Sequence, residues 1–245
     1  MQTGPHKYLE ISNEGKILII TLSNPPNNYL PGAIFSEFDS CLELMESPDV
    51  EAIVFTGKGK VFSKGADISE FKGNLKGGDH RAILHGNEII SSISRLTKPV
   101  IAAINGPCFG AGLELALACH IRLCSEKARL GLPELSIGVI PGLGGIERLI
   151  RVIGETKALE MILLGDMISA SRSLELNLVN RVLPKKDFFL KVLVFVRTIL
   201  AAGTDSTEEI LRLFALSRSE HEERNIAEAA EGFVRLVSCK KSLFS

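Results

Sequence analysis

The stretch NGPCFGAGLELALACH, residues 105–120, decides how the rest of the chain is interpreted. It follows VIAAI at 100–104, an apolar run typical of a buried strand, and its glycines lead into an apolar segment that can form a helix. Glu114 lies inside that segment, although an ionised carboxylate is almost never fully buried without a partner. Because an unpaired buried charge is costly enough to shift its own pKa, Glu114 is either solvated at a surface or required by a site.

Outward from this stretch, the chain repeats a strand, a glycine-rich corner and a helix, which indicates an α/β protein. Strands are expected at 7–12, 17–22, 51–57, 98–104, 119–125, 128–134 and 178–184, with a short strand inside 57–71. Helices are expected at 34–47, 82–96 and 155–165, and then consecutively at 187–200, 205–219 and 225–238. Asp205 or Ser206 is expected to cap the helix at 205–219. The change to consecutive helices places a boundary near residue 187.

The composition is that of an ordinary globular protein. The 245 residues allow one large domain or a core with a smaller appendage, and 45% of them are hydrophobic and 23% charged. The net charge of −1 gives no electrostatic basis for binding nucleic acid or an anionic membrane, and the absence of Trp argues against base stacking. Neither nucleic acid nor a membrane is therefore expected as a partner.

Three features predict a cytoplasmic location. No apolar run reaches the roughly 18 residues of a membrane span. The start MQTGPHKYLEIS has neither the apolar region of a secretory signal nor the Arg-rich character of a transit peptide. The number of cysteines is odd, no two of them have CxxC spacing, and most lie in apolar segments, so they are expected to be reduced. They are Cys41, Cys108, Cys119, Cys124 and Cys239.

The glycines at 110 and 112 allow three interpretations. A dinucleotide-binding fingerprint would need a third glycine at 115, where the chain has Leu115, and GKGK at 57–60 does not have the spacing of a phosphate-binding loop. A purely structural corner would only allow close packing, with Glu114 facing the positive end of a helix dipole. A catalytic corner would present unpaired N–H groups at a helix N-terminus to a carbonyl oxygen that becomes an oxyanion.

The catalytic interpretation gains support from a second corner, SKGAD at 63–67, which follows the strand at 51–57. One N–H group from each corner could hold a single thioester oxygen. No hydrolase triad is expected, because Ser63 has no evident His and Asp partners.

Four segments, in order over about residues 8–185, resemble the enoyl-CoA hydratase/isomerase family, the crotonases. They are GKGKVFSKGADI at 57–68, NGPCFGAGLELALACH at 105–120, GLPELSIGVIPGLGG at 131–145 and LNLVNRVLP at 176–184, with a weaker echo in EGFVRLVSCKKSLF at 231–244. The resemblance implies a spiral of ββα units with a helical C-terminal region that assembles trimers, often paired into hexamers. On this basis residues 1–186 are expected to form the crotonase-like α/β core, and residues 187–245 the helical trimerisation region.

The resemblance also implies the catalytic residues. Glu114 and Glu134 match the two glutamates of the family's hydratases, with Glu114 activating water and Glu134 serving the α-carbon of the thioester. Two carboxyl groups that share one water resist simultaneous ionisation, so one of them is expected to have a raised pKa. The oxyanion hole is expected from the backbone N–H groups of Ala66 and Ala111. Because Ala111 replaces a family glycine, its backbone must accept a Cβ.

Coenzyme A is expected along 64–68, with contacts from Lys64, Ala66, Asp67 and Ile68. Lys64 is expected either to reach a phosphate or to be solvated, and Asp67 to brace the loop. Lys240 and Lys241 are expected to be a solvated basic end rather than phosphate ligands. Coenzyme A is part of the substrate, so no separate cofactor is expected, and the histidines show no metal-binding spacing.

The sequence therefore predicts an enoyl-CoA hydratase, which adds water reversibly and syn to a 2-enoyl-CoA. An enoyl-CoA isomerase, which needs only one carboxylate, and a dehydratase acting on a carrier-protein thioester remain open. A non-catalytic scaffold is disfavoured because both glutamates are retained, and a nicotinamide oxidoreductase because the glycine spacing fails. His120 stands where many family members have Asp and is expected to cap or pack rather than to catalyse.

Overall fold

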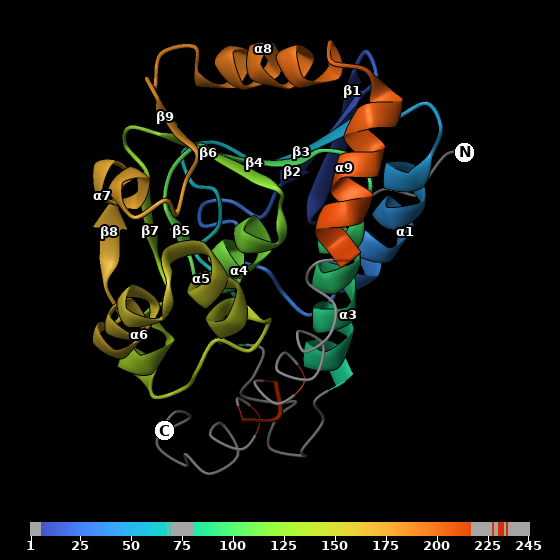
Figure 1. Ribbon diagram of the computed structural model, residues 1–245. Helices are drawn as coiled ribbons and strands as arrows, with labels where there is room; N and C mark the ends of the chain where they lie inside the picture. The colour runs from blue at the N-terminus through green and yellow to red at the C-terminus, as the bar shows by residue number, and fades with distance from the viewer. Residues whose placement is uncertain are drawn as a thin grey trace.

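The runs expected as strands form a six-stranded sheet in the computed structural model of the protein, which describes residues 6–67, 69, 81–216, 227, 230–232 and 234 (Figure 1). The strand order is β1-β2-β3-β4-β6-β9; β1 is antiparallel to β2, and every later pair is parallel. The strands are β1 (Leu9–Glu14), β2 (Ile17–Leu22), β3 (Ala52–Gly57), β4 (Val100–Ile104), β6 (Ile121–Ser125) and β9 (Arg181–Leu183).

Helices cover both faces of this sheet (Figure 1). They are α1 (Ile34–Glu46), α3 (Arg81–Arg95), α4 (Ala111–Ala118), the 3-10 helix η2 (Pro133–Ile137), α5 (Gly145–Ile153), α6 (Glu155–Leu164), α7 (Ala170–Glu175), α8 (Phe188–Leu200) and α9 (Thr204–Leu216). α1, α3 and α4 pack on one face in the larger hydrophobic core, and α8 packs on the other. The central strands are thus buried on both sides, which is why they read as unbroken apolar runs.

A second, three-stranded sheet brings the two expected catalytic segments together. It consists of β5 (Cys108–Phe109), β7 (Arg129–Gly131) and β8 (Met167–Ser169), with β5 parallel to β7 and β8 antiparallel to β7. The register pairs Phe109 with Gly131, and the Gly110 N–H donates to the Gly131 carbonyl at 3.0 Å. Because β5 leads into α4 and β7 leads towards η2, the elements that carry Glu114 and Glu134 begin at the same edge of this sheet.

Two local predictions are wrong. After β3 ends at Gly57, no further strand forms within the described part of 57–71. Ser63 and Ala66 make only isolated bridges, to Cys108 and Leu30, because the chain turns at Gly65, where φ is +96°. Neither Asp205 nor Ser206 is the cap of α9, which begins at Thr204. The tight turn after α8, in which Gly203 N–H donates to the Leu200 carbonyl, starts α9 one residue earlier than expected.

The predicted boundary near residue 187 stays a prediction, because the first helix after it, α8, packs on the core sheet. α9 then packs against α3 (Figure 1). The helix expected at 225–238 lies mostly outside the described residues, as do Ile68, Cys239, Lys240 and Lys241. Among the described helices, none combines the length and apolar character needed to span a membrane. The expected α/β fold with helices after the core is confirmed.

Candidate active site

The two glycine corners touch because side-chain atoms are missing where they meet. A Cβ on Gly112 would lie 2.7 Å from Ser63 Cβ and 2.9 Å from the Ser63 carbonyl oxygen. A Cβ on Gly65 would lie 3.0 Å from the Phe109 carbonyl oxygen and 3.3 Å from the Ala111 nitrogen. Glycine is therefore needed here for the close approach of two backbone segments, as in the structural interpretation, and this approach brings the 63–67 loop against the N-terminus of α4.

Both N–H groups expected in the oxyanion hole are available. The bridge between Ala66 and Leu30 uses the Gly65 carbonyl and the Asp67 N–H, so the Ala66 N–H has no acceptor within the described residues. The same holds for the Ala111 N–H in the first turn of α4, where helix geometry leaves N–H groups unpaired. Ala111 has helical backbone and accepts its Cβ without strain; the unusual conformation falls on Gly110 instead, with φ of 53°.

Glu114 is buried and held by backbone donors. Its side chain comes from the middle of α4, the residue is only 2% exposed, and its Oε1 accepts the N–H groups of Leu143 and Gly145, each at 2.8 Å. A Cβ on Gly145 would lie 2.8 Å from this same oxygen. The carboxylate is thus tolerated in an apolar helix because the turn at 141–145 supplies it with two donors.

Glu134 lies in the first turn of η2, close to Gly110, which precedes α4. Its Oε1 would be 3.0 Å from a Cβ on Gly110, and its Oε2 is shielded from solvent without a partner within the described residues. A solvated loop acid would not have such an oxygen. A buried carboxyl oxygen without a protein donor is one that a water or a ligand can satisfy.

Both carboxyl groups have raised pKa values, and the charge of Glu114 contributes to the shift of Glu134. Burial raises the pKa of Glu114 to about 7, against the opposing effects of its two backbone donors and of Arg148. Burial and the negative charge of Glu114 raise the pKa of Glu134 to about 8. Near neutral pH the pair therefore retains a proton, which allows one carboxyl to act as an acid while the other acts as a base.

The remaining expected site residues lie beside this pair or outside the described residues. Lys64 is exposed, and its backbone N–H donates to the Asn27 carbonyl at 3.0 Å. The Asp67 carboxylate accepts the Ser69 N–H at 3.0 Å and so braces the loop as expected. His120 accepts the Val100 N–H at its Nδ1, 3.1 Å away, at the start of β4, which is a structural position.

The sequence did not reveal what holds Glu114. The sequence identifies PGLGG at 141–145 only as part of the family-like segment at 131–145, and its contribution is the pair of N–H groups that Glu114 accepts. Because these donors are backbone groups, the identities of the residues give no sign of them. The buried Arg148 and Asn87, which bond to this turn, were also missed.

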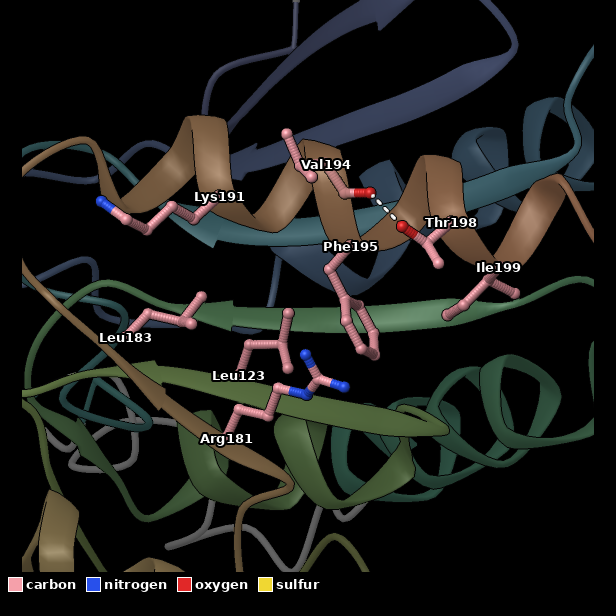
Figure 2. Close-up of a pocket in the computed structure, with 8 residues that line it drawn as sticks. All are labelled: Leu123, Arg181, Leu183, Lys191, Val194, Phe195, Thr198 and Ile199. Carbon is pink, nitrogen blue, oxygen red and sulfur yellow. Dashed lines mark hydrogen bonds between the residues drawn. The ribbon is translucent and has the colours of Figure 1, made fainter.

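A separate pocket of about 230 Å³ lies between α8 and strands β6 and β9 (Figure 2). Leu123 in its floor points to the α8 side of the sheet, and the pocket therefore faces away from the core that contains α4. It has no carboxyl group for acid–base chemistry and is not part of the glutamate site. Its lining residues are Leu123, Arg181, Leu183, Lys191, Val194, Phe195, Thr198 and Ile199.

Comparison with known proteins agrees with this geometry. The model of the enoyl-CoA hydratase/isomerase family matches residues 12–242. A "Probable enoyl-CoA hydratase" of Bacillus subtilis is 46% identical over 167 residues, which are 67% of this chain and 64% of that protein. The "Peroxisomal fatty acid beta-oxidation multifunctional protein AIM1" of Arabidopsis thaliana is 42% identical over 182 residues, 73% of this chain and 25% of that protein. The matched region thus spans less than two thirds of either relative.

Solved structures extend the match over nearly the whole chain. An enoyl-CoA hydratase/isomerase from Mycobacterium paratuberculosis superposes with a TM-score of 0.90 at 26% identity, covering 99% of this chain and 97% of that one. An enoyl-CoA hydratase from Bacillus anthracis superposes with a TM-score of 0.82 at 30% identity, covering 94% and 92%. These matches agree with the paired glutamates and the two touching corners. The chain therefore belongs to the enoyl-CoA hydratase/isomerase family and has the crotonase fold.

Proposed function

We propose that this protein is an enoyl-CoA hydratase, which adds water reversibly and syn to a 2-enoyl-CoA and so forms a 3-hydroxyacyl-CoA. The observation that carries this proposal is the pair of glutamates at the α4 N-terminus, which has a free N–H group: Glu114 is buried, and Glu134 is half-buried with its Oε2 shielded from solvent. The names of the relatives from Bacillus subtilis and Arabidopsis thaliana support hydration and a place in the β-oxidation of fatty acids.

In the proposed reaction, the thioester carbonyl oxygen accepts the N–H groups of Ala66 and Ala111. Glu114 takes a proton from water as the water oxygen bonds to the β-carbon of the substrate. The electron pair of the carbon–carbon double bond moves towards the carbonyl, and the resulting enolate oxygen is stabilised by the two N–H groups. Each such donor contributes about 2.7–4 kcal/mol to lowering the barrier. Glu134 then gives its proton to the α-carbon.

The two carboxyl groups have surroundings that suit these roles. The two N–H groups on Glu114 Oε1 and the positive charge of Arg148 favour the ionised form, as a general base requires. Glu134 Oε2 has no donor within the described residues, and burial and the negative charge of Glu114 raise the pKa of Glu134. These surroundings favour the protonated form of Glu134, as a general acid requires.

Substrate binding and location belong to the same proposal. Coenzyme A would lie along the 64–68 segment, with Lys64, Ala66, Asp67 and Ile68 as its contacts, and the exposed position of Lys64 suits a phosphate. We place the protein in the cytoplasm, in keeping with the four cysteines among the described residues, which are free and buried.

Assembly into a trimer, or a hexamer of paired trimers, is also proposed. Apolar side chains are exposed where η2 and α6 meet; a Cβ on Gly165, directly after α6, would lie 3.6 Å from Pro133 Cα. This η2–α6 surface consists of Leu135, Ile137, Leu159, Leu163, Leu164 and Met167. Gathered exposed apolar side chains mark interaction sites, and a second copy of the chain would cover them here.

The test is the loss of absorbance of the conjugated thioester when the protein meets crotonyl-CoA. Loss that collapses by about 10²–10⁴-fold in both Glu114→Gln and Glu134→Gln is the expected result. Tight binding of an acyl-CoA without loss of absorbance would overturn the proposal. Conversion of a 3-enoyl-CoA under the same conditions would then identify an isomerase.

A further inference from the structure

The turn at 141–145 is itself held from two helices. Asn87 on α3 donates from Nδ2 to the Gly142 carbonyl at 2.9 Å, and Arg148 on α5 donates from Nη1 to the Leu143 carbonyl at 2.7 Å. The Leu143 and Gly145 N–H groups of the same turn donate to Glu114 Oε1. The Gly142 carbonyl and the Leu143 N–H belong to one planar peptide unit, so the bond from Asn87 orients that N–H directly. The Leu143 carbonyl, which Arg148 holds, belongs to the next unit, between the two N–H groups that Glu114 accepts.

Both side chains are buried deeply enough for these bonds to matter. Asn87 is 6% exposed and Arg148 is 4% exposed. Within the described residues, the bond to Gly142 is the one hydrogen bond that the Asn87 amide makes. Arg148 also donates from Nη2 to Ser91 Oγ at 3.3 Å, so its planar guanidinium joins α5, α3 and the turn.

The turn passes so close to Glu114 that no side chain fits at position 145. A Cβ on Gly145 would lie 2.8 Å from Glu114 Oε1 and 2.9 Å from Glu114 Cγ, and also 3.1 Å from Pro141 Cβ. A small displacement of the turn would therefore push the carboxylate or lengthen its two hydrogen bonds. Misplacement of a catalytic group by about 1 Å can cost about 10²-fold in rate.

We propose that Arg148 and Asn87 are positioning residues for the general base: they hold the turn at 141–145 so that its two N–H groups fix one oxygen of Glu114 and leave the other for water. Arg148 adds a positive charge that favours the ionised carboxylate, and Asn87 adds none. The inference rests on the proposed function of Glu114. Within the described residues, the charge of Arg148 on α5 lowers the pKa of Glu114, and the charge of Glu114 raises the pKa of Glu134 on η2.

The experiment compares Arg148→Met, Arg148→Lys and Asn87→Ala with the wild type in crotonyl-CoA hydration across pH. A fall in kcat of about 10–100-fold with little change in KM is expected for all three. The acidic limb of the kcat profile should move to higher pH in Arg148→Met alone, because only that variant loses the positive charge. Arg148→Lys should have the acidic limb at the wild-type pH but should not have the wild-type kcat.

Arg122 provides a matched control. It is also buried and donates to backbone carbonyls, those of Cys119 and Leu178, but at the other end of α4. Arg122→Met should reduce thermal stability without moving the acidic limb. If Arg148→Met has the profile of Arg122→Met, Arg148 is only structural and the proposal is wrong. If Arg148→Met does not fold, wild-type kcat in both Arg148→Lys and Asn87→Ala would overturn it.

A second readout separates this proposal from the proposed function. The infrared band of a protonated carboxyl group, assigned by its loss in Glu114→Gln, follows the titration of Glu114 without any substrate. Titration of that band at higher pH in Arg148→Met is expected even if crotonyl-CoA is not the substrate. An unchanged titration would overturn the role of Arg148 even in an active hydratase.

Discussion

The paired glutamates make the stability of the protein fall as pH rises. Burial raises the pKa of both groups in the folded state, and the charge of Glu114 raises that of Glu134 further, so the native protein binds protons more tightly than the unfolded chain does. The stabilisation that this provides is fully present below pH 4.5, the ordinary value, and is lost as pH rises towards 8. The difference between 4.5 and about 8 for Glu134 corresponds to about 5 kcal/mol, at about 1.36 kcal/mol per pH unit.

Urea unfolding at a series of pH values between 5 and 9 measures this dependence. Glu134→Gln keeps the shape of the side chain but cannot ionise, so its free energy of unfolding should exceed that of the wild type at pH 8 by several kcal/mol. Glu114→Gln should also flatten the dependence, because it removes the charge that raises the pKa of Glu134. The double variant should gain less than the sum of the two, since each single change already removes the repulsion.

Parallel pH profiles for the wild type and Glu134→Gln would refute this reasoning. They would mean that water in the substrate pocket solvates Glu134 well enough to keep its carboxylate ionised in the folded protein. Additive effects in the double variant would refute the coupling of the two carboxyl groups and leave only burial as a cause.

Three further predictions concern other parts of the structure. Gly112→Ala should lower the free energy of unfolding by about 1–3 kcal/mol and reduce kcat/KM, because its Cβ meets Ser63; an unchanged unfolding midpoint would contradict this contact. The thiols of Cys41, Cys119 and Cys124, whose pKa burial raises to about 12, should react with a thiol reagent only in denaturant, measured in a Cys239→Ser background; fast reaction in the native protein would contradict their burial. Leu163→Lys on the η2–α6 surface should lower the mass of the oligomer measured by light scattering; an unchanged mass would mean that the subunit interface lies elsewhere.

Much of the fold could be predicted from the sequence because its signals are local. A parallel strand buried on both faces needs an unbroken apolar run, and β2, β3 and β4 have one. Glu114 was detectable because a single carboxylate inside an apolar helix demands an explanation. The positions of Ala66 and Ala111 followed from the resemblance of the glycine corners to a known family, and their roles remain proposals.

The surroundings of the site were not predictable because they depend on tertiary contacts. The donors to Glu114 are main-chain groups of Leu143 and Gly145, whose side chains carry no chemistry. Asn87 and Arg148 look like ordinary polar residues of surface helices until the packing of α3, α4 and α5 buries them. The start of α9 was misplaced because a turn directly after α8, and not a side-chain cap, determines it.

The contact between Gly112 and Ser63 also bears on how the protein is synthesised. As the chain leaves the ribosome, β1 to β3 and the corner at 63–67 are made well before α4, and the turn at 141–145 comes later still. Glu114 therefore receives its two backbone donors, and the two corners touch, only once these three segments have docked. If the proposed function is right, a partly refolded chain is inactive, and recovery of activity reports completed assembly of the core, which recovery of helix content alone does not.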